Sequence, residues 1–317
     1  LSAEESPTVV GEAILSGAGA YLNKMTLTPE GLATAVRDVL KSSVNTPQSV
    51  TATAVEDVPN DKGADKQAAG VKYRGHDKLD TGPGGASYRF VRLIGRGAMS
   101  RVYLAERDED RSMVVLKILD RDVSRDPLNV QRFADEGALL YGIDSPYVVK
   151  VFDHGMTNSY GYIAMEFFGR GDLAQRLKQP VSPDDAVLFL HNIACGLDAI
   201  HRAGVVHRDL KPGNIMVGDD DSLALTDFGI AQNDSLEESM TATGSGGCTP
   251  FYMSREQCDG FRATAGSDLY ALGIILFEML AGQRPFTGSS ASMVFWQHLS
   301  APIPELPWRL SMFQPTI

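Results

Sequence analysis

The fold of this chain is decided by the stretch Val205-Val206-His207-Arg208-Asp209-Leu210-Lys211-Pro212-Gly213-Asn214 and, further along, by Asp227-Phe228-Gly229. Two acidic residues, a lysine and an asparagine lie there at fixed offsets, in a turn-rich segment that follows a long helical pattern. Phosphoryl transfer needs a carboxylate that orients the attacking hydroxyl and accepts its proton. It also needs a carboxylate and an amide to hold Mg²⁺ against a nucleotide, and a cation near the moving group. The residue types therefore indicate phosphoryl-transfer chemistry.

These motifs resemble those of protein kinases, in which the catalytic loop reads H-R-D-L-x-x-x-N and the metal loop reads D-F-G. The resemblance implies that Asp209 is the catalytic base and that Lys211 faces the γ-phosphate of ATP. Asn214 and Asp227 would then hold the metal, which is Mg²⁺ or alternatively Mn²⁺. A lysine at position 211 also resembles the serine/threonine branch of the family more than the tyrosine branch.

The implied fold class is α+β, with the two lobes of a protein kinase: a small, mostly antiparallel sheet with one helix, then a helical lobe. The resemblance covers about residues 88–310, with an N-lobe and hinge over residues 87–168 and an incomplete C-lobe over residues 169–317. Two helices expected at the far end are missing, with the arginine that would pair with Glu256. Because the chain starts at Leu1 rather than Met, we expect a fragment of a longer protein.

Residues 1–42 read as a unit of their own, in which two helix starts with proline at the first position flank a short strand. This order resembles the last third of a response-regulator receiver domain, a partial doubly wound α/β unit. By that resemblance Ser2 is the switch hydroxyl, Tyr21 the switch aromatic residue and Lys24 the phosphate-facing lysine. An unrelated helical cap is the alternative. Residues 43–86 read as a flexible linker, because small polar residues dominate and periodicity is missing.

Composition restricts the class of protein further. The net charge of −11 and the pI near 5.0 argue against a nucleic-acid-binding surface. Three cysteines without C-x-x-C spacing indicate a reducing compartment, so we expect a cytoplasmic protein. The longest apolar run, at residues 269–280, is too short to span a bilayer and contains Glu278. No membrane segment is therefore expected in this chain.

A glycine-rich turn precedes the catalytic loop, in the run Ile94-Gly95-Arg96-Gly97-Ala98-Met99-Ser100-Arg101-Val102 between two expected strands. Gly95 and Gly97 let backbone amides approach a phosphate group without a side chain in the way. Such a turn alone is more often an ordinary hairpin. It resembles the kinase glycine loop, with Ser100 in place of the third glycine.

Lys117 lies inside the apolar strand expected at residues 113–119, where a buried ion needs a partner. The kinase resemblance supplies the α- and β-phosphates of ATP and the carboxylate of Glu136. Glu136 falls on a helix that begins at Asp126-Pro127 and has apolar residues at helical spacing. A surface glutamate is the alternative interpretation of Glu136.

A strand expected at residues 160–166 leads into a segment that resembles the hinge between kinase lobes. There the backbone of Glu166 and Phe168 would bond the adenine of ATP, and Asp172 would reach the ribose. The other side chains that the resemblance places around the nucleotide are Ile94, Val102, Val115 and Met216.

The polar stretch at residues 231–247 resembles an activation loop, with Thr241 and Thr243 as candidate phosphorylation sites. The block at residues 248–256 resembles the kinase segment that docks substrate through Thr249.

That docking block departs from the family pattern at two positions, with Cys248 in place of glycine and Arg255 in place of proline. Beyond it, an almost wholly apolar helix ends near Gly282 and would be buried. Its Asp268 would anchor the backbone of the catalytic loop.

The expected function is transfer of the ATP γ-phosphoryl group to serine or threonine in proteins, with autophosphorylation on the activation loop and regulation by the receiver unit. A homodimer and an upstream histidine kinase are the expected partners. A pseudokinase scaffold is the alternative, although the residues that such proteins usually lack are all present: Lys117, Asp209, Asn214 and Asp227. A small-molecule phosphotransferase is the third reading, but Thr249-Pro250 and the long loop favour a protein substrate.

Overall fold

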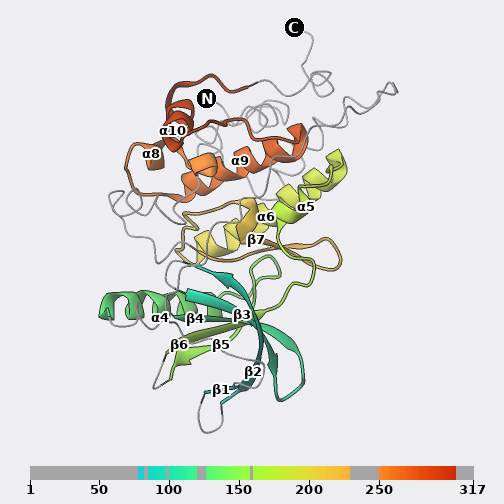
Figure 1. Cartoon of the computed structure of the whole chain (residues 1–317). Helices are drawn as coiled ribbons and strands as arrows, with labels where there is room; N and C mark the ends of the chain where they lie inside the picture. Colours follow the sequence, from blue (N-terminus) through green and yellow to red (C-terminus); the bar gives the residue numbers. More distant parts are fainter. Residues whose placement is uncertain are drawn as a thin grey trace.

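The computed structural model describes residues 78–81, 85–97, 100–119, 126–157, 160–228 and 250–304, which form two lobes (Figure 1). The expected receiver-like unit at residues 1–42, with its Ser2, Tyr21 and Lys24, lies outside the described residues. The same is true of Cys248 and of the three candidate threonines, Thr241, Thr243 and Thr249.

The first lobe is built on a six-stranded sheet with the strand order β1-β2-β3-β4-β6-β5, in which every neighbouring pair is antiparallel. The strands are β1 (Lys78–Asp80), β2 (Ser87–Arg96), β3 (Ser100–Arg107), β4 (Met113–Leu119), β5 (Val151–Met156) and β6 (Gly161–Glu166). The strands expected around the glycine turn and around Lys117 are confirmed. Strand β5 begins at Val151, and Val148, three residues earlier, forms an isolated bridge with Leu225.

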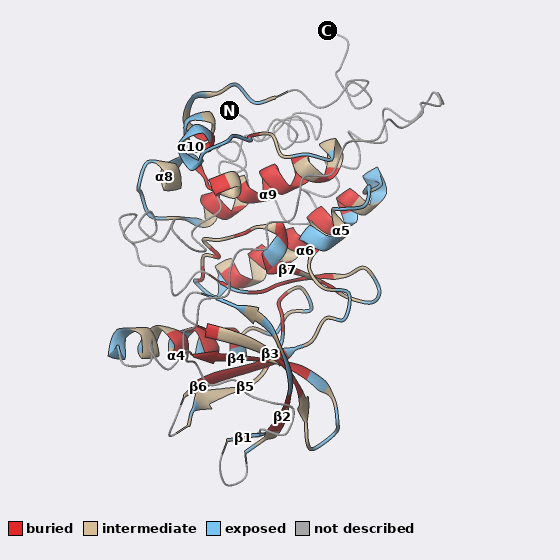
Figure 2. Cartoon of the chain, viewed as in Figure 1, coloured by how far each residue is buried: buried red, intermediate tan, exposed pale blue. Residues whose placement is uncertain are grey.

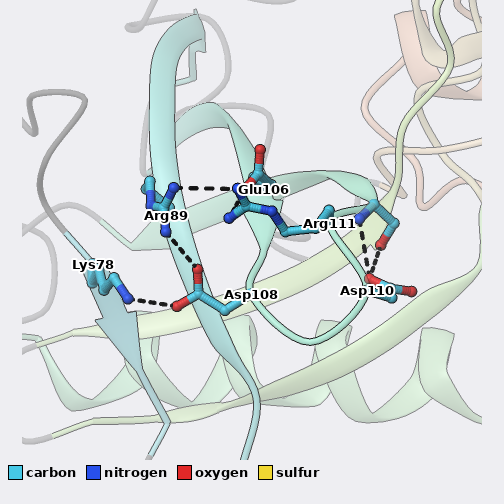
Figure 3. Close-up of polar contacts among 7 residues, drawn as sticks. Lys78, Arg89, Glu106, Asp108, Asp110 and Arg111 are labelled. Atoms are coloured by element: carbon cyan, nitrogen blue, oxygen red, sulfur yellow. Dashed lines mark hydrogen bonds and ion pairs between the residues drawn. The ribbon is translucent and has the colours of Figure 1, made fainter.

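Strand β1 lies within residues 43–86, where the sequence indicates a linker without periodic structure. Leu79 pairs with Tyr88 of β2 and is 0% exposed, so one apolar residue in a polar run is enough to fix this strand on the lobe. Lys78 pairs with Asp108 at 2.7 Å, and Arg89 bonds the same carboxylate at 3.1 Å (Figure 3). The ordered first lobe therefore starts earlier in the chain than composition suggests.

Helix α4 (Pro127–Tyr141) packs against β5 and β6. Asp126 caps its first turn, because the Asp126 carboxylate accepts from the Leu128 amide at 3.0 Å. Gly137 permits close packing: a Cβ at that position would lie 3.0 Å from the His154 Cβ. This packing brings Glu136 within reach of β4.

The second lobe is mostly helical, as expected. Its elements are α5 (Leu173–Arg176), α6 (Pro183–Arg202), η2 (Pro212–Asn214), β7 (Ile215–Val217), β8 (Leu223–Leu225), η5 (Pro250–Tyr252), α8 (Arg255–Cys258), α9 (Ala265–Ala281) and α10 (Ala291–Ser300). Ser182 caps α6 through its hydroxyl, and Gly282 ends α9 with a left-handed φ of 71°.

One apolar core joins the lobes. It includes Leu119 and Met165 of the sheet, Leu190 of α6 and Ile275 of α9. Figure 2 shows the buried faces of α6 and α9 turned toward each other, with the β7–β8 hairpin on the side of the sheet. Residues 205–214 follow α6 and lead through η2 into β7. Among the described residues, no helix is long and apolar enough to cross a membrane.

Candidate active site

Asp268 of α9 fixes the backbone of the segment that follows α6. Its carboxylate, 1% exposed, accepts from the His207 amide at 2.8 Å and from the Arg208 amide at 2.9 Å. Its Oδ2 atom also lies 2.8 Å from Nε2 of His201. The predicted anchoring by Asp268 is thus confirmed, and these bonds compensate for the left-handed backbone of Arg208, whose φ is 68°.

Asp209, Lys211 and Asn214 are brought together on the anchored segment. Nζ of Lys211 lies 2.6 Å from Oδ2 of Asp209. Nδ2 of Asn214 donates to the same oxygen at 3.1 Å and to the Asp209 carbonyl at 2.8 Å. An ammonium group and an amide both contact the Asp209 carboxylate, so they hold it in one orientation. A general base needs such a fixed orientation to accept the proton of an incoming hydroxyl.

Lys117 joins the two lobes electrostatically. Its Nζ atom lies 2.7 Å from Oε1 of Glu136 and 3.1 Å from Oδ1 of Asp227. The Glu136 carboxylate is buried, whereas about half of the Asp227 side chain, 48%, is exposed. The structure therefore brings together all three residues, and Glu136 is not the surface glutamate of the alternative interpretation.

The pKa shifts follow from this geometry. Burial alone would lower the pKa of Lys117, but the carboxylates of Asp227 and Glu136 outweigh it and raise the pKa. The positive charge of the Lys117 ammonium holds the pKa of Asp227 below its usual range. Burial raises the pKa of Glu136. Lys117 is therefore a permanent cation near neutral pH, and Asp227 is ionised.

The two expected metal ligands fit a hard cation. Because Nδ2 of Asn214 is engaged with Asp209, the oxygen of that amide is the atom turned to other ligands. Asp227 presents a half-exposed carboxylate on a backbone with φ of 54°. In the described part of the chain, no cluster of three or more His, Cys, Asp or Glu could hold a metal. One amide and one carboxylate suit Mg²⁺, which takes its remaining ligands from phosphates and water.

His207 supports Asp227 through the neighbouring Phe228. The His207 ring is 0% exposed and lies 4.8 Å from the Phe228 ring, centroid to centroid. Neither ring nitrogen of His207 has a hydrogen-bond partner in the described structure, and burial lowers the pKa of this histidine. The ring is therefore neutral and acts as an apolar support, a role that the motif alone does not reveal.

The glycine turn and the hinge lie on either side of Lys117. Gly97 donates to the Ser100 carbonyl at 2.8 Å, and Val102 pairs with Lys117 across the sheet. The Ile94 side chain is 38% exposed at the end of β2. Three of the expected nucleotide neighbours are only partly buried against the joint core: Val115, Phe168 and Met216.

One of the two expected hinge residues already uses its backbone amide in a hydrogen bond. The Glu166 amide donates to the Lys150 carbonyl at 2.9 Å, so a donor to adenine has to come from Phe168. Asp172 caps α5, since its Oδ1 accepts from the Gln175 amide at 2.8 Å. The Asp172 carboxylate is therefore already held by the Gln175 amide, and the Asp172 backbone forms an isolated antiparallel bridge with Met216.

The docking block has partners that sequence reasoning missed. Arg255 donates to the Leu299 carbonyl of α10 at 2.7 Å, and Glu256 accepts from the Ser267 hydroxyl at 2.5 Å. Ser267 thus bonds the carboxylate for which an arginine was expected. Gln257 donates to the Arg208 carbonyl at 2.9 Å. These contacts join residues far apart in sequence, and no local motif indicates them.

Comparison with known proteins gives a consistent result. The family model described as "Protein kinase domain" matches residues 88–312. Probable serine/threonine-protein kinase PknB of Lactococcus lactis is 39% identical over 223 residues, which are 69% of this chain and 35% of that protein. PknA of Corynebacterium glutamicum is 37% identical over 234 residues, 72% of this chain and 50% of that protein. PknE of Mycobacterium tuberculosis is 37% identical over 219 residues, 68% of this chain and 38% of that protein. The chain thus spans a third to a half of the length of these curated relatives.

Proposed function

The chain belongs to the protein kinase family, and from this we propose that it transfers the γ-phosphoryl group of ATP to serine and threonine hydroxyls of proteins. The observation that carries the proposal is the arrangement around Asp209, whose Oδ2 lies 2.6 Å from Lys211 and 3.1 Å from Asn214. The relatives named above are serine/threonine-protein kinases, which supports the choice of hydroxyl.

In the proposed reaction Asp209 orients the substrate hydroxyl and takes its proton as oxygen attacks the γ-phosphorus. Such a positioned base contributes about 10²- to 10⁴-fold to the rate. Lys211 holds one Asp209 oxygen and places a positive charge where the phosphoryl group moves. Transfer to the hydroxyl then breaks the bond between the γ-phosphorus and the bridging oxygen of ADP.

Lys117 binds the α- and β-phosphates in this proposal, and Glu136 holds its ammonium in place. Mg²⁺, with Mn²⁺ as the alternative, would be held by Asn214 and Asp227 and would neutralise phosphate charge. Ile94, Val102, Val115 and Met216 would enclose the base and sugar of ATP. The glycine turn, through Gly95, Gly97 and Ser100, would cover the phosphates with backbone amides.

A pseudokinase is the competing function, and a transfer assay separates the two. Purified protein is incubated with Mg²⁺, γ-labelled ATP and a generic protein substrate, with the Asp209→Asn variant as the control. Label on serine or threonine that disappears in the variant supports the kinase. Nucleotide binding without label would support the scaffold, and label on tyrosine would contradict the proposed hydroxyl.

We further propose that Thr241 and Thr243 are autophosphorylated and that Thr249 docks the substrate. Each phosphate adds about −1.5 to −2 charge near neutral pH, enough to create new charge-assisted bonds to arginine. Mass spectrometry of active protein tests the proposal. Phosphate confined to residues 43–86 would contradict it.

Regulation by the receiver-like unit, through homodimerisation and an upstream histidine kinase, is also a proposal. Dimerisation would raise the local concentration of activation loops for phosphorylation in trans. A switch of this kind requires contacts that differ between two receiver states. The test treats full-length protein with beryllofluoride, and an unchanged autophosphorylation rate and oligomeric mass would exclude the coupling.

A further inference from the structure

Gln257 connects the docking block with the peptide that precedes Asp209. Its Nε2 donates to the Arg208 carbonyl at 2.9 Å. Its Oε1 accepts from the Ser254 amide at 3.0 Å and from the Ser254 hydroxyl at 3.1 Å. Because donors surround one end of the amide and an acceptor meets the other, the side chain has a single favourable orientation.

The peptide between Arg208 and Asp209 is fixed at both of its polar atoms. Gln257 holds the carbonyl of Arg208, and the Asp209 amide donates to the His207 carbonyl at 2.9 Å. The preceding peptide is held separately, because the Arg208 amide donates to Asp268. Arg208 itself has a positive φ of 68°, which an arginine adopts only where its surroundings impose it.

This held peptide is the backbone unit that leads directly into Asp209, so its position sets where the Asp209 Cα lies. Gln257 fixes the carbonyl side of this peptide, and the Asp209 carboxylate that projects from the next Cα meets Lys211 and Asn214. A residue far along the chain, Gln257, donates to the Arg208 carbonyl. Gln257 lies on α8, whose first two residues, Arg255 and Glu256, are also the last two residues of the docking block.

We propose that Gln257 is a positioning residue for the catalytic base: it holds the Arg208–Asp209 peptide so that Asp209 points at the substrate hydroxyl. The inference rests on the proposed kinase function. It also assigns the docking block a direct effect on the base, since Ser254 and Gln257 belong to one capping box at the start of α8.

The oxygen and the nitrogen of the Gln257 side-chain amide make different contacts, which can be removed separately. Oε1 completes the capping box of α8, whereas Nε2 reaches the catalytic loop. Gln257→Glu keeps an acceptor for Ser254 but replaces the donor by an oxygen that faces the Arg208 carbonyl. Ser254→Ala is the matched control, because it weakens the cap and leaves the Nε2 donor in place.

The experiment measures kcat, the KM for ATP and the melting temperature of the intact chain and both variants, at pH about 8 and at about 5.5. We expect Gln257→Glu to lower kcat by about 10- to 100-fold at pH 8, the effect of misplacing a catalytic group by about 1 Å. The KM for ATP should stay within about twofold, since Gln257 does not touch the nucleotide site. At the lower pH the difference in kcat between Gln257→Glu and wild type should become smaller. The reason is that a protonated carboxyl group at position 257 can donate to the Arg208 carbonyl. Ser254→Ala should lower the melting temperature and keep most of kcat.

Four outcomes would overturn the inference. One is a Gln257→Glu variant with wild-type kcat at pH 8; another is an equal loss of kcat in Ser254→Ala, which would assign the effect to the cap. If Gln257→Glu does not fold, Gln257→Met replaces it, and wild-type kcat in that variant would count against the inference in the same way. An inactive wild type would overturn the proposed function itself, and with it this inference.

Discussion

The ammonium of Lys117 lies 2.7 Å from Oε1 of Glu136, and Glu136 is 3% exposed. One residue comes from the central strand β4 and the other from the helix α4 that packs on the sheet. Because the pair links the sheet to this helix, breaking it should affect stability as well as the proposed transfer reaction.

Lys117→Met should abolish transfer and also destabilise the protein. Removing one partner of a buried ion pair leaves the other charge without compensation, at a cost of about 3–5 kcal/mol. The double variant Lys117→Met/Glu136→Gln should recover much of the stability and none of the activity. Denaturant unfolding and the transfer assay measure the two effects. If the free energy of unfolding of Lys117→Met equals that of wild type, the buried Glu136 carboxylate does not need Lys117 for compensation of its charge.

Asp268→Asn should lower kcat by weakening the catalytic loop. The new amide would present a donor to the His207 or Arg208 amide, and an unsatisfied buried donor costs about 1–3 kcal/mol. Asp198→Asn is the control, because Asp198 forms only a surface pair with Arg202, at 2.9 Å. Steady-state kinetics of both variants test the expectation. Equal kcat values would contradict the anchoring role.

Stability should fall in mild acid because of buried histidine. Burial lowers the pKa of His298 to about 4, and its Nδ1 lies 2.8 Å from the Tyr270 hydroxyl. The unfolded chain, with a pKa of about 6.5, binds the proton first. The stabilising effect is therefore fully present above pH about 6.5 and is lost as the pH falls toward about 4. His207, whose pKa burial also lowers, adds to the same trend.

The His298→Asn variant tests this pH dependence. Asparagine retains a partner for Tyr270 but does not titrate, so the slope of unfolding free energy against pH should become shallower between about 6.5 and 4. Urea unfolding at several pH values supplies the slope. A slope identical to that of wild type would assign the acid sensitivity to other groups.

The early strand β1 should contribute to the stability of the first lobe. Leu79→Ala removes a fully buried side chain, and such changes cost about 2–5 kcal/mol. Lys78→Ala, on the same strand, removes only a surface ion pair with Asp108 and should have little effect. Melting temperatures distinguish the two. If both variants melt like wild type, β1 does not stabilise the lobe.

The sequence predicts those parts of the fold and site that depend on local patterns. The strand around Lys117, the capped helix with Glu136 and the anchoring by Asp268 follow from periodicity, capping residues and motif spacing. Strand β1 could not be predicted in this way, because three residues with a single apolar side chain show no hydrophobic periodicity. Local patterns also do not predict the bonds of Gln257 to Arg208 and of Glu256 to Ser267, since tertiary packing alone brings these residues together.

The central claim is that Asp209 serves as the base for transfer to a protein hydroxyl, and one measurement tests it most directly. Initial rates of γ-phosphoryl transfer from labelled ATP are compared between wild type and Asp209→Asn, with folding checked by melting temperature. The account predicts phosphoserine or phosphothreonine from wild type and a rate about 10²- to 10⁴-fold lower from the folded variant. A folded Asp209→Asn variant that transfers phosphate at the wild-type rate would contradict it.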